Sequence, residues 1–297
     1  MSFRTSTATQ LRQNLQDLQA TQERMALNNA RITSGSRIGS PGEDPNGTAL
    51  ILDFGNSIQA NTQYLKQISS ASAFLTSTED AVNGAVQGVM RLQELAVSGN
   101  SASVPEVNAI LQNLLALANT QSQGKYLFSG TQTGIAPFSA TSAVPYSYSG
   151  NQQDINLGVS TDTLVATNLT GDEVFLGGKN LAPGASPSDL FTAVQTLADG
   201  FQNADGTKVK TATTNLDAVL ANLNDMLAKL GGRQAGLQSL QTTLGNFNAS
   251  LQSLQSAQES TDYPTAITEY SNDQTIQSAT LSVMAKANKV NLFDYLG

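Results

Sequence analysis

Three residue types are missing from this sequence: its 297 residues include no cysteine, no tryptophan and no histidine. Without histidine and cysteine, catalysis by Ser-His-Asp or Cys-His groups is excluded. Zinc or copper sites built on these ligands are excluded as well. The fold cannot depend on disulfide bonds. Only carboxylate or lysine chemistry stays open to an enzyme of this composition, and nothing in the sequence indicates a cofactor or a metal site.

Charged residues are scarce, at 13 % of the chain, about half of the usual share. The net charge is −8 and no basic run exists, so we expect no nucleic-acid partner. No apolar stretch reaches the roughly 20 residues that span a bilayer, and the N-terminus shows no apolar segment of a cleavable signal peptide. We therefore expect no membrane partner. A polar surface with few charges can pack against copies of itself without strong repulsion.

A heptad-like pattern predicts one helix at each end of the chain, over residues 5–33 and 265–291. In the first pattern, Gln22 and Asn29 occupy steps where an apolar residue is expected. Two such helices alone bury too little surface to be stable, so we expect them to be protease-sensitive in a monomer and to fold on assembly. We predict that these residues make intersubunit contacts: Leu11, Leu15, Leu18, Met25, Ile32, Ile276, Leu281, Val283, Met284, Val290 and Phe293.

Two long heptad patterns, over residues 51–96 and 216–254, predict long helices that pack against each other through an intramolecular core. The first begins at Asp44-Pro45, with Asp44 as the N-cap. A shorter helix is predicted from a capping box at residues 103–106 to Gly124. Gly84 and Gly88 are expected to allow a neighbouring helix to pack closely.

Between the helices, residues 126–181 are typical of a small β-rich insertion. Tyr146 and Tyr148 alternate with polar residues before the turn Gly150-Asn151, and residues 155–159 alternate after it, which predicts a β-hairpin. Residues 174–176 predict a further strand. Residues 186–189 then predict the start of a short helix that ends near Phe201.

The expected fold is mainly α with inserted β: an elongated antiparallel helical rod with paired terminal helices and a small β-rich domain at its tip. We divide the chain into a terminal helical assembly domain (residues 1–40 with 263–297), a helical rod domain (41–130 with 185–262) and a β-rich domain (131–184). Arg37, Asp44 and Pro264 are expected at the joint between the first two. Pro264 is expected to interrupt or kink the helix there.

Several segments resemble a known family. Residues 32–38 and 43–47 are similar to the N-terminal signature of bacterial flagellins and of the hook-associated protein at the hook–filament junction. Residues 125–131 and 148–151 resemble segments of that junction protein, and residues 281–288 resemble the shared C-terminal helix. The resemblance covers nearly the whole chain and is closest to the flagellar hook-associated protein 3 group of the flagellin-like family. Pro264 departs from the pattern, because relatives often continue the helix at this position.

The resemblance implies a structural subunit of the bacterial flagellum at the junction between hook and filament. The implied partners are hook-associated protein 1, flagellin, copies of the chain in a ring, and a cytoplasmic flagellar export chaperone that binds the C-terminal region. The implied location is extracellular, reached through type III export without a cleaved signal peptide.

Two alternatives to a junction subunit stay open at this point. The first is flagellin itself, the bulk subunit of the filament. The second is an unrelated secreted coiled-coil protein or an enzyme that uses carboxylates. The adjacent carboxylates Glu79-Asp80 and Asp172-Glu173 are the candidates for such chemistry, but neighbouring helical residues do not share a face, and nothing nearby in sequence would shift a pKa. We therefore expect no enzyme.

Overall fold

The computed structural model describes residues 2–139, 146–159, 164–179, 181 and 184–296, and within them the side chains from residue 9 to residue 286. Helices dominate, and the chain forms two compact units. The first, called here the terminal unit, comprises Met1–Ala60 and Phe247–Gly297; the second, the central unit, comprises Asn61–Asn246. The expected class, mainly α with inserted β, is confirmed. No helix of the described part is long and apolar enough to cross a membrane.

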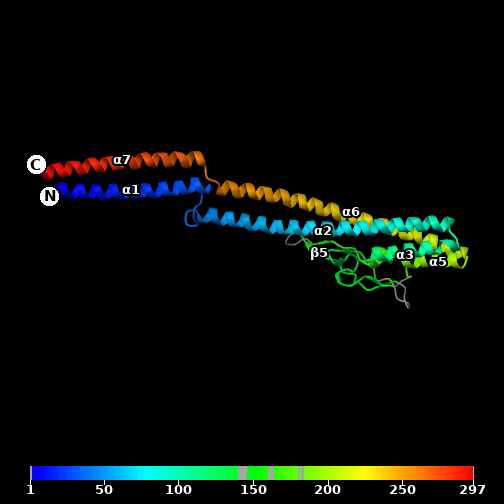
Figure 1. The fold of residues 1–297 in the computed structure, drawn as a ribbon. Helices are drawn as coiled ribbons and strands as arrows, with labels where there is room; N and C mark the ends of the chain where they lie inside the picture. The colour runs from blue at the N-terminus through cyan, green and yellow to red at the C-terminus, as the bar shows by residue number, and fades with distance from the viewer. Residues whose placement is uncertain (1, 140–145, 160–163, 180, 182–183, 297) are drawn as a thin grey trace. The chain divides into compact units, whose positions relative to one another are not determined.

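In the terminal unit, α1 (Ser2–Ser34) and α7 (Tyr263–Leu296) lie side by side and antiparallel. Both chain termini are at the same end of this pair (Figure 1). The two predicted terminal helices and their pairing are therefore confirmed, with each helix extending a few residues beyond the predicted bounds. The expected interruption near Pro264 is confirmed too, because one helix ends at Glu259 and the next begins at Tyr263.

Two helices of 54 residues each, α2 (Pro45–Ser98) and α6 (Gly206–Glu259), form the long elements of the chain. The predicted N-cap of α2 is confirmed, because Asp44 Oδ1 accepts a hydrogen bond of 2.8 Å from the Gly47 N–H. Along both helices, positions of the predicted heptads are fully buried in the central unit. These are Ile68, Leu75, Val82, Val89, Leu216, Leu223, Leu230 and Leu237.

The glycines of α2 allow close packing of α3 (Val104–Ala118), as expected. A Cβ placed on Gly84 would lie 3.1 Å from Leu117 Cδ1, and one on Gly88 would lie 3.0 Å from Leu114 Cδ2. The predicted capping box at residues 103–106 is wrong. It is formed instead by Asn100 and Ser103 around a 3₁₀ turn, η1 (Ser101–Ser103), because the Ser103 hydroxyl turns back to accept from the Asn100 N–H.

The predicted end of the third helix at Gly124 is also wrong, because that helix ends at Ala118. Gln123 and Gly124 both have positive φ angles, 51° and 74°. Two consecutive left-handed residues form the tight turn that joins strands with the natural twist. They therefore connect a short hairpin, β1 (Gln121–Ser122) and β2 (Lys125–Tyr126), instead of ending a helix.

The predicted hairpin around Gly150-Asn151 is wrong as well. β3 (Phe138–Ser139) pairs with β4 (Ser147–Tyr148), and β5 (Asn156–Gly158) pairs with β6 (Leu164–Ala166), each antiparallel. Asn151 and Tyr148, expected in and beside the hairpin turn, instead form hydrogen bonds with residues 128–131. The Asn151 side chain bonds to Thr131, and the Tyr148 hydroxyl lies 2.9 Å from the Phe128 carbonyl oxygen. These contacts fix residues 148–151 against the segment at 128–131, so they do not close a hairpin.

Residues 174–176 do not form the predicted strand. Val174 and Phe175 belong to a short helix, α4 (Gly171–Phe175), and Leu176 follows it. All three side chains are at most 1 % exposed, whereas a strand would point alternate residues to opposite faces. Phe175 packs edge-on against Phe128 and Phe138, and this aromatic core favours the helical turn. The next helix, α5 (Leu190–Gln202), begins as predicted, with Asp189 accepting from the Thr192 N–H as its N-cap.

Candidate assembly surface

The contact between α1 and α7 is polar at its centre. Thr21 and Asn28 of α1 and Asp273 of α7 are buried, with exposed fractions of 3 %, 5 % and 6 %. Arg24 reaches across the pair, and its Nε and Nη2 donate to Asp273 Oδ1 at 3.2 and 2.9 Å. The hydrogen bond to Asp273, followed by its charge, raises the pKa of the Arg24 guanidinium. A hydrogen-bonded ion pair therefore joins the two helices at the centre of their contact.

The buried side of α1 keeps the predicted Leu18, Met25 and Ile32, but the seam positions between them lie one residue earlier than predicted. Thr21 and Asn28 are buried, whereas the expected polar interruptions, Gln22 and Asn29, are exposed. The same offset occurs on α7, where Asp273 is buried in place of Gln274. Apolar residues next to the seam are consequently left outside.

The predicted intersubunit residues divide into two groups by exposure. Leu18, Met25, Ile32 and Met284 are half-buried along the α1–α7 contact. The exposed group comprises Leu11 at 38 %, Leu15 at 44 %, Ile276 at 48 %, Leu281 at 50 % and Val283 at 58 %. The side chains of Val290 and Phe293 lie outside the described residues. Sequence reasoning missed Leu27, which is 44 % exposed, because it does not fit the heptad spacing.

The contact alternates buried polar residues with half-buried apolar ones and leaves further leucines outside, whereas a usual helix pair buries its whole apolar stripe. Exposed apolar side chains that recur along both helices of a pair favour an interaction surface. We name the exposed residues Leu11, Leu15, Leu27, Ile267, Ile276, Leu281 and Val283 the outer apolar face of the terminal helices.

The two linkers of the terminal unit are bonded to each other. Ser36 and Ser260 form an antiparallel β-bridge. The Arg37 N–H donates to the Glu259 carbonyl oxygen at 2.7 Å, and the Thr261 N–H donates to the Gly35 carbonyl oxygen at 2.9 Å. The backbone before α2 and the backbone after α6 are thus tied together.

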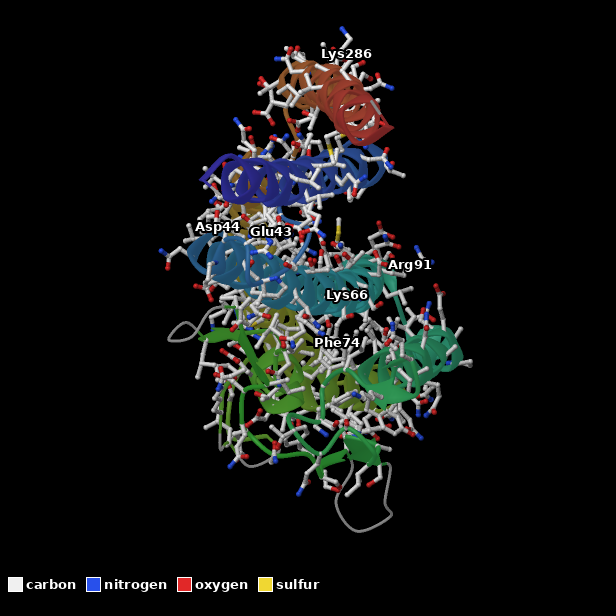
Figure 2. All side chains as sticks on the ribbon, turned by 90° about the vertical axis from the view of Figure 1, so that its left-hand side faces the viewer. Glu43, Asp44, Lys66, Phe74, Arg91 and Lys286 are labelled. Carbon is white, nitrogen blue, oxygen red and sulfur yellow. The ribbon has the colours of Figure 1, made fainter. Side chains whose placement is uncertain are left out.

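Side chains reinforce this joint. The Arg37 side chain donates from Nη2 to Asp44 Oδ2 at 3.0 Å and from Nε to the Gln258 carbonyl oxygen at 3.2 Å. Asp44 and its neighbour Glu43 lie at the start of α2 (Figure 2). The Gly47 N–H and then the Arg37 side chain lower the pKa of the Asp44 carboxyl. Two of the three predicted joint residues are therefore in direct contact.

The third predicted joint residue, Pro264, is the second residue of α7. A proline in the first turn of a helix sacrifices no helical hydrogen bond, because that N–H has no intrahelical partner. Sequence reasoning missed Gly35, which adopts φ +72° where α1 ends. A Cβ there would lie 2.8 Å from the Tyr263 hydroxyl oxygen. A glycine at the end of a predicted helix is a known signal for this conformation.

The long heptads do not bury all of their apolar residues. Phe247 and Leu254 of α6 are 52 % and 54 % exposed, so their prediction as core is wrong. Both lie in the terminal unit, which begins at Phe247 on this helix. On α2, Leu50 and Leu52 are also exposed, at 46 % and 61 %.

The carboxylate pairs have structural partners. Glu79 Oε2 accepts from Gln234 Nε2 at 2.9 Å, and Glu173 forms an ion pair with Lys229. Asp172 is buried and accepts the Glu173 N–H. Within the described residues, no group of three or more acidic, histidine or cysteine side chains is placed to hold a metal ion.

Comparison with known proteins bears on this arrangement of helices. The bacterial flagellin N-terminal helical region matches residues 5–133, and the bacterial flagellin C-terminal helical region matches residues 213–296. These are the two ends that pair in the structure. The chain belongs to the flagellin-like family. The interpretation as an unrelated coiled-coil protein is thereby set aside.

Individual relatives of the flagellin-like family are similar over much of the chain. Flagellar hook-associated protein 3 of Escherichia coli is 24 % identical over 58 % of this chain and 57 % of its own length. The Salmonella typhimurium protein of the same name is 24 % identical over 77 % of this chain and 79 % of its own length. Flagellin of Salmonella typhimurium is 29 % identical over 72 % of this chain, but over 43 % of its own length.

Solved structures of this family share the fold. FlgL of Bacillus cereus superimposes with a TM-score of 0.57 at 21 % identity, over 67 % of this chain and 97 % of that one. The flagellar junction protein FlgL of Legionella pneumophila gives a TM-score of 0.58 at 18 % identity, over 70 % of this chain and all of that one.

Proposed function

We propose that the chain is a structural subunit of the bacterial flagellum that forms the junction between the hook and the flagellin filament. The observation that carries this proposal is the outer apolar face of a helix pair whose contact is polar at its centre. Such a pair gains stability when neighbouring subunits cover its leucines, at roughly 25 cal/mol per Å² of apolar surface removed from water. Membership in the flagellin-like family supports the same role.

In this proposal the three sequence regions take separate tasks. Residues 1–40 with 263–297 are the assembly domain, residues 41–130 with 185–262 are the rod, and residues 131–184 are an inserted domain. The predicted contact residues from Leu11 to Phe293 meet neighbouring subunits. Arg37, Asp44 and Pro264 hold the assembly domain to the rod.

The proposed partners are hook-associated protein 1 on the hook side, flagellin on the filament side, and copies of the chain in a ring. A cytoplasmic export chaperone binds the C-terminal region before export. The chain leaves the cell through the type III apparatus without a cleaved signal peptide and acts outside it. This role needs no catalysis and no cofactor.

The test is deletion of the gene in its natural host. Loss of a junction subunit leaves hooks without filaments, while flagellin appears in the medium. Immunogold labelling of the wild type gives one spot where the hook ends. Retained filaments in the deletion strain would contradict the proposal.

Flagellin is the second candidate, favoured by the 29 % identity to Salmonella flagellin. It predicts immunogold labels along the whole filament. The junction role is preferred because the hook-associated protein 3 of the same organism is matched over 79 % of its length, against 43 % for flagellin.

A further inference from the structure

The central unit has a cleft of about 590 Å³. Its lining residues are different from those of the outer apolar face. Its walls come from α2, the β1–β2 hairpin and the β5 region. Ala71 is buried, and Phe74, Ile155 and Leu157 are half-buried, so part of the cleft is apolar. Lys66 and Phe74 contribute from α2 (Figure 2). The volume falls in the range of about 300–1,000 Å³ that is typical of ligand pockets.

Lys66 and Lys125 are the charged residues of this cleft. Both are exposed, and the ammonium group of neither forms an ion pair or a hydrogen bond in the described part of the protein. The chain as a whole has 23 acidic and 15 basic residues. Two unpaired ammonium groups beside an apolar surface are complementary to a carboxylate that is flanked by apolar side chains.

One segment of this same chain has that composition. Asp53 of α2 is exposed and has no ion pair in the described part of the protein. Leu50, which lies one turn earlier on the same side of the helix, is 46 % exposed. Glu23 and Glu269 also have an exposed apolar neighbour, but they lie on the terminal helices, where the outer apolar face is already assigned to other contacts.

We propose that the cleft of one copy of the chain receives Asp53 and Leu50 of the next copy, which lie one turn apart on the same side of α2. Asp53 cannot fill the cleft of its own chain, because it lies 13 positions before Lys66 on one helix, which corresponds to about 20 Å. The contact joins two different surfaces, and such head-to-tail contacts generate rings or helical assemblies. This inference rests on the proposed function, because it needs copies that lie next to each other.

Single-cysteine copies test the contact, because the natural chain has no cysteine. Cells producing one copy with Asp53→Cys and another with Lys66→Cys yield flagella, which are treated with a short bismaleimide. We expect a covalent dimer of one copy of each kind, in about tenfold excess over the control with Asp53→Cys and Lys210→Cys. Lys210 is an exposed lysine outside the cleft. A yield equal to that of the control overturns the inference.

Exchanging the charges provides a second, independent test. Asp53→Lys, and separately Lys66→Glu with Lys125→Glu, place like charges together and reduce incorporation into flagella by about tenfold or more. Combining the three substitutions restores opposite charges and should restore incorporation, whereas Lys210→Glu leaves it unchanged. If the triple variant is no better than its parents, the pairing is wrong.

The two proposals fail in different ways. A wild-type chain that is absent from isolated flagella contradicts the junction role. The cross-linking is then repeated on the concentrated, purified full chain. If the yield of the dimer between Asp53→Cys and Lys66→Cys exceeds that of the control with Lys210→Cys, the contact is still supported. If the two yields are equal, the contact is overturned. A chain found at the junction without this dimer contradicts the contact alone.

Discussion

Arg24 of the first helix and Asp273 of the last helix form a hydrogen-bonded ion pair of 2.9 Å. The Asp273 side chain is 9 % exposed, whereas that of Arg24 is 53 % exposed. Removal of the arginine therefore leaves a buried carboxylate without its partner, which costs more than the pair itself contributes. The two residues fix one register of α1 against α7.

Arg24→Ala should loosen the terminal pair. The expected result is faster protease cleavage in α1 and α7 of the monomer, with unchanged cleavage in the central unit. Limited proteolysis followed by mass spectrometry measures both. Arg12→Ala is the matched control, since Arg12 is exposed on the same helix. Equal cleavage of the two variants would show that the ion pair does not hold the helices together.

Substitutions on the outer apolar face should separate folding from assembly. Leu15→Glu and Leu281→Glu change exposed side chains, so the unfolding free energy of the monomer changes by less than about 0.5 kcal/mol. Incorporation into flagella should fall by about tenfold or more for each, because a buried leucine contributes about 1.5–3 kcal/mol. Thermal unfolding and immunoblots of isolated flagella measure the two effects.

The control for this face is Gln274→Glu, an exposed polar position on α7. It adds the same charge without removing a leucine, so incorporation should stay near that of the wild type. A loss equal to that of Leu281→Glu would attribute the effect to charge and not to the apolar contact.

Gly35→Ala should weaken the joint between the two linkers. The residue adopts φ +72°, where a side chain costs about 1–2 kcal/mol. The added Cβ would also displace the Tyr263 hydroxyl. Gly42→Ala in the same linker is the control, because its Cβ would meet open space. We expect a lower unfolding temperature of the terminal unit for Gly35→Ala alone, measured by calorimetry.

The joint should also depend on pH through Asp44. Its pKa is lower in the folded chain than the ordinary value of 3.8. The resulting stabilisation is present above pH 3.8 and is lost as the pH falls through the lowered pKa of the folded state. Amide hydrogen exchange of residues 36–48, corrected for its intrinsic pH dependence, should therefore accelerate on acidification.

Asp44→Asn keeps an oxygen that accepts from the Gly47 N–H but has no proton to gain. Its hydrogen exchange in residues 36–48 should change little over the same pH range. An acid-induced acceleration as large as that of the wild type would assign the effect to other carboxyl groups.

Tyr148 should make the central unit sensitive to alkaline pH. Burial, followed by the charge of Asp172, raises the pKa of this phenol above its usual value of 10. The stabilisation is complete below pH 10 and is lost as the pH rises towards the raised pKa. Tyr148→Phe removes the hydroxyl contacts to Phe128 and Asn151, which should cost about 1–2 kcal/mol at pH 7.

Urea unfolding at neutral pH and above pH 10 tests this prediction. The wild type should lose stability at the higher pH by more than Tyr148→Phe does. Tyr64→Phe, on α2, is the control and should follow the wild type. A parallel decline in all three proteins would mean that the pKa of Tyr148 is the same in the folded and the unfolded chain.

Helices were predictable from the sequence because their periodicity extends over many residues. The long heptads placed Ile68, Leu75 and Leu216 correctly in the core. Asp44 and Asp189 marked helix starts correctly, since a cap depends on a few adjacent residues. These signals are local, and tertiary contacts agree with them.

Several of the failures concern contacts between distant segments. Val174 and Phe175 read as a strand, but the aromatic core around Phe128 favours a helical turn. The exposed face of the terminal helices was misplaced by one residue, because Asp273 pairs with Arg24, which is 249 positions away in the sequence. A polar residue within a heptad does not reveal whether its partner is water or a distant arginine.

The bond between Ser36 and Ser260 has a consequence for the order of folding. The first helix packs against the last helix. The two can therefore dock only when both ends of the chain are on the same side of the membrane. Contacts of such sequence separation form late, because the closure of long loops is entropically costly. In a chain that is exported one end first, the central unit can fold while α1 is still without its partner α7. The terminal pair is then the last part to close, and until it does, both of its members are available to a neighbour.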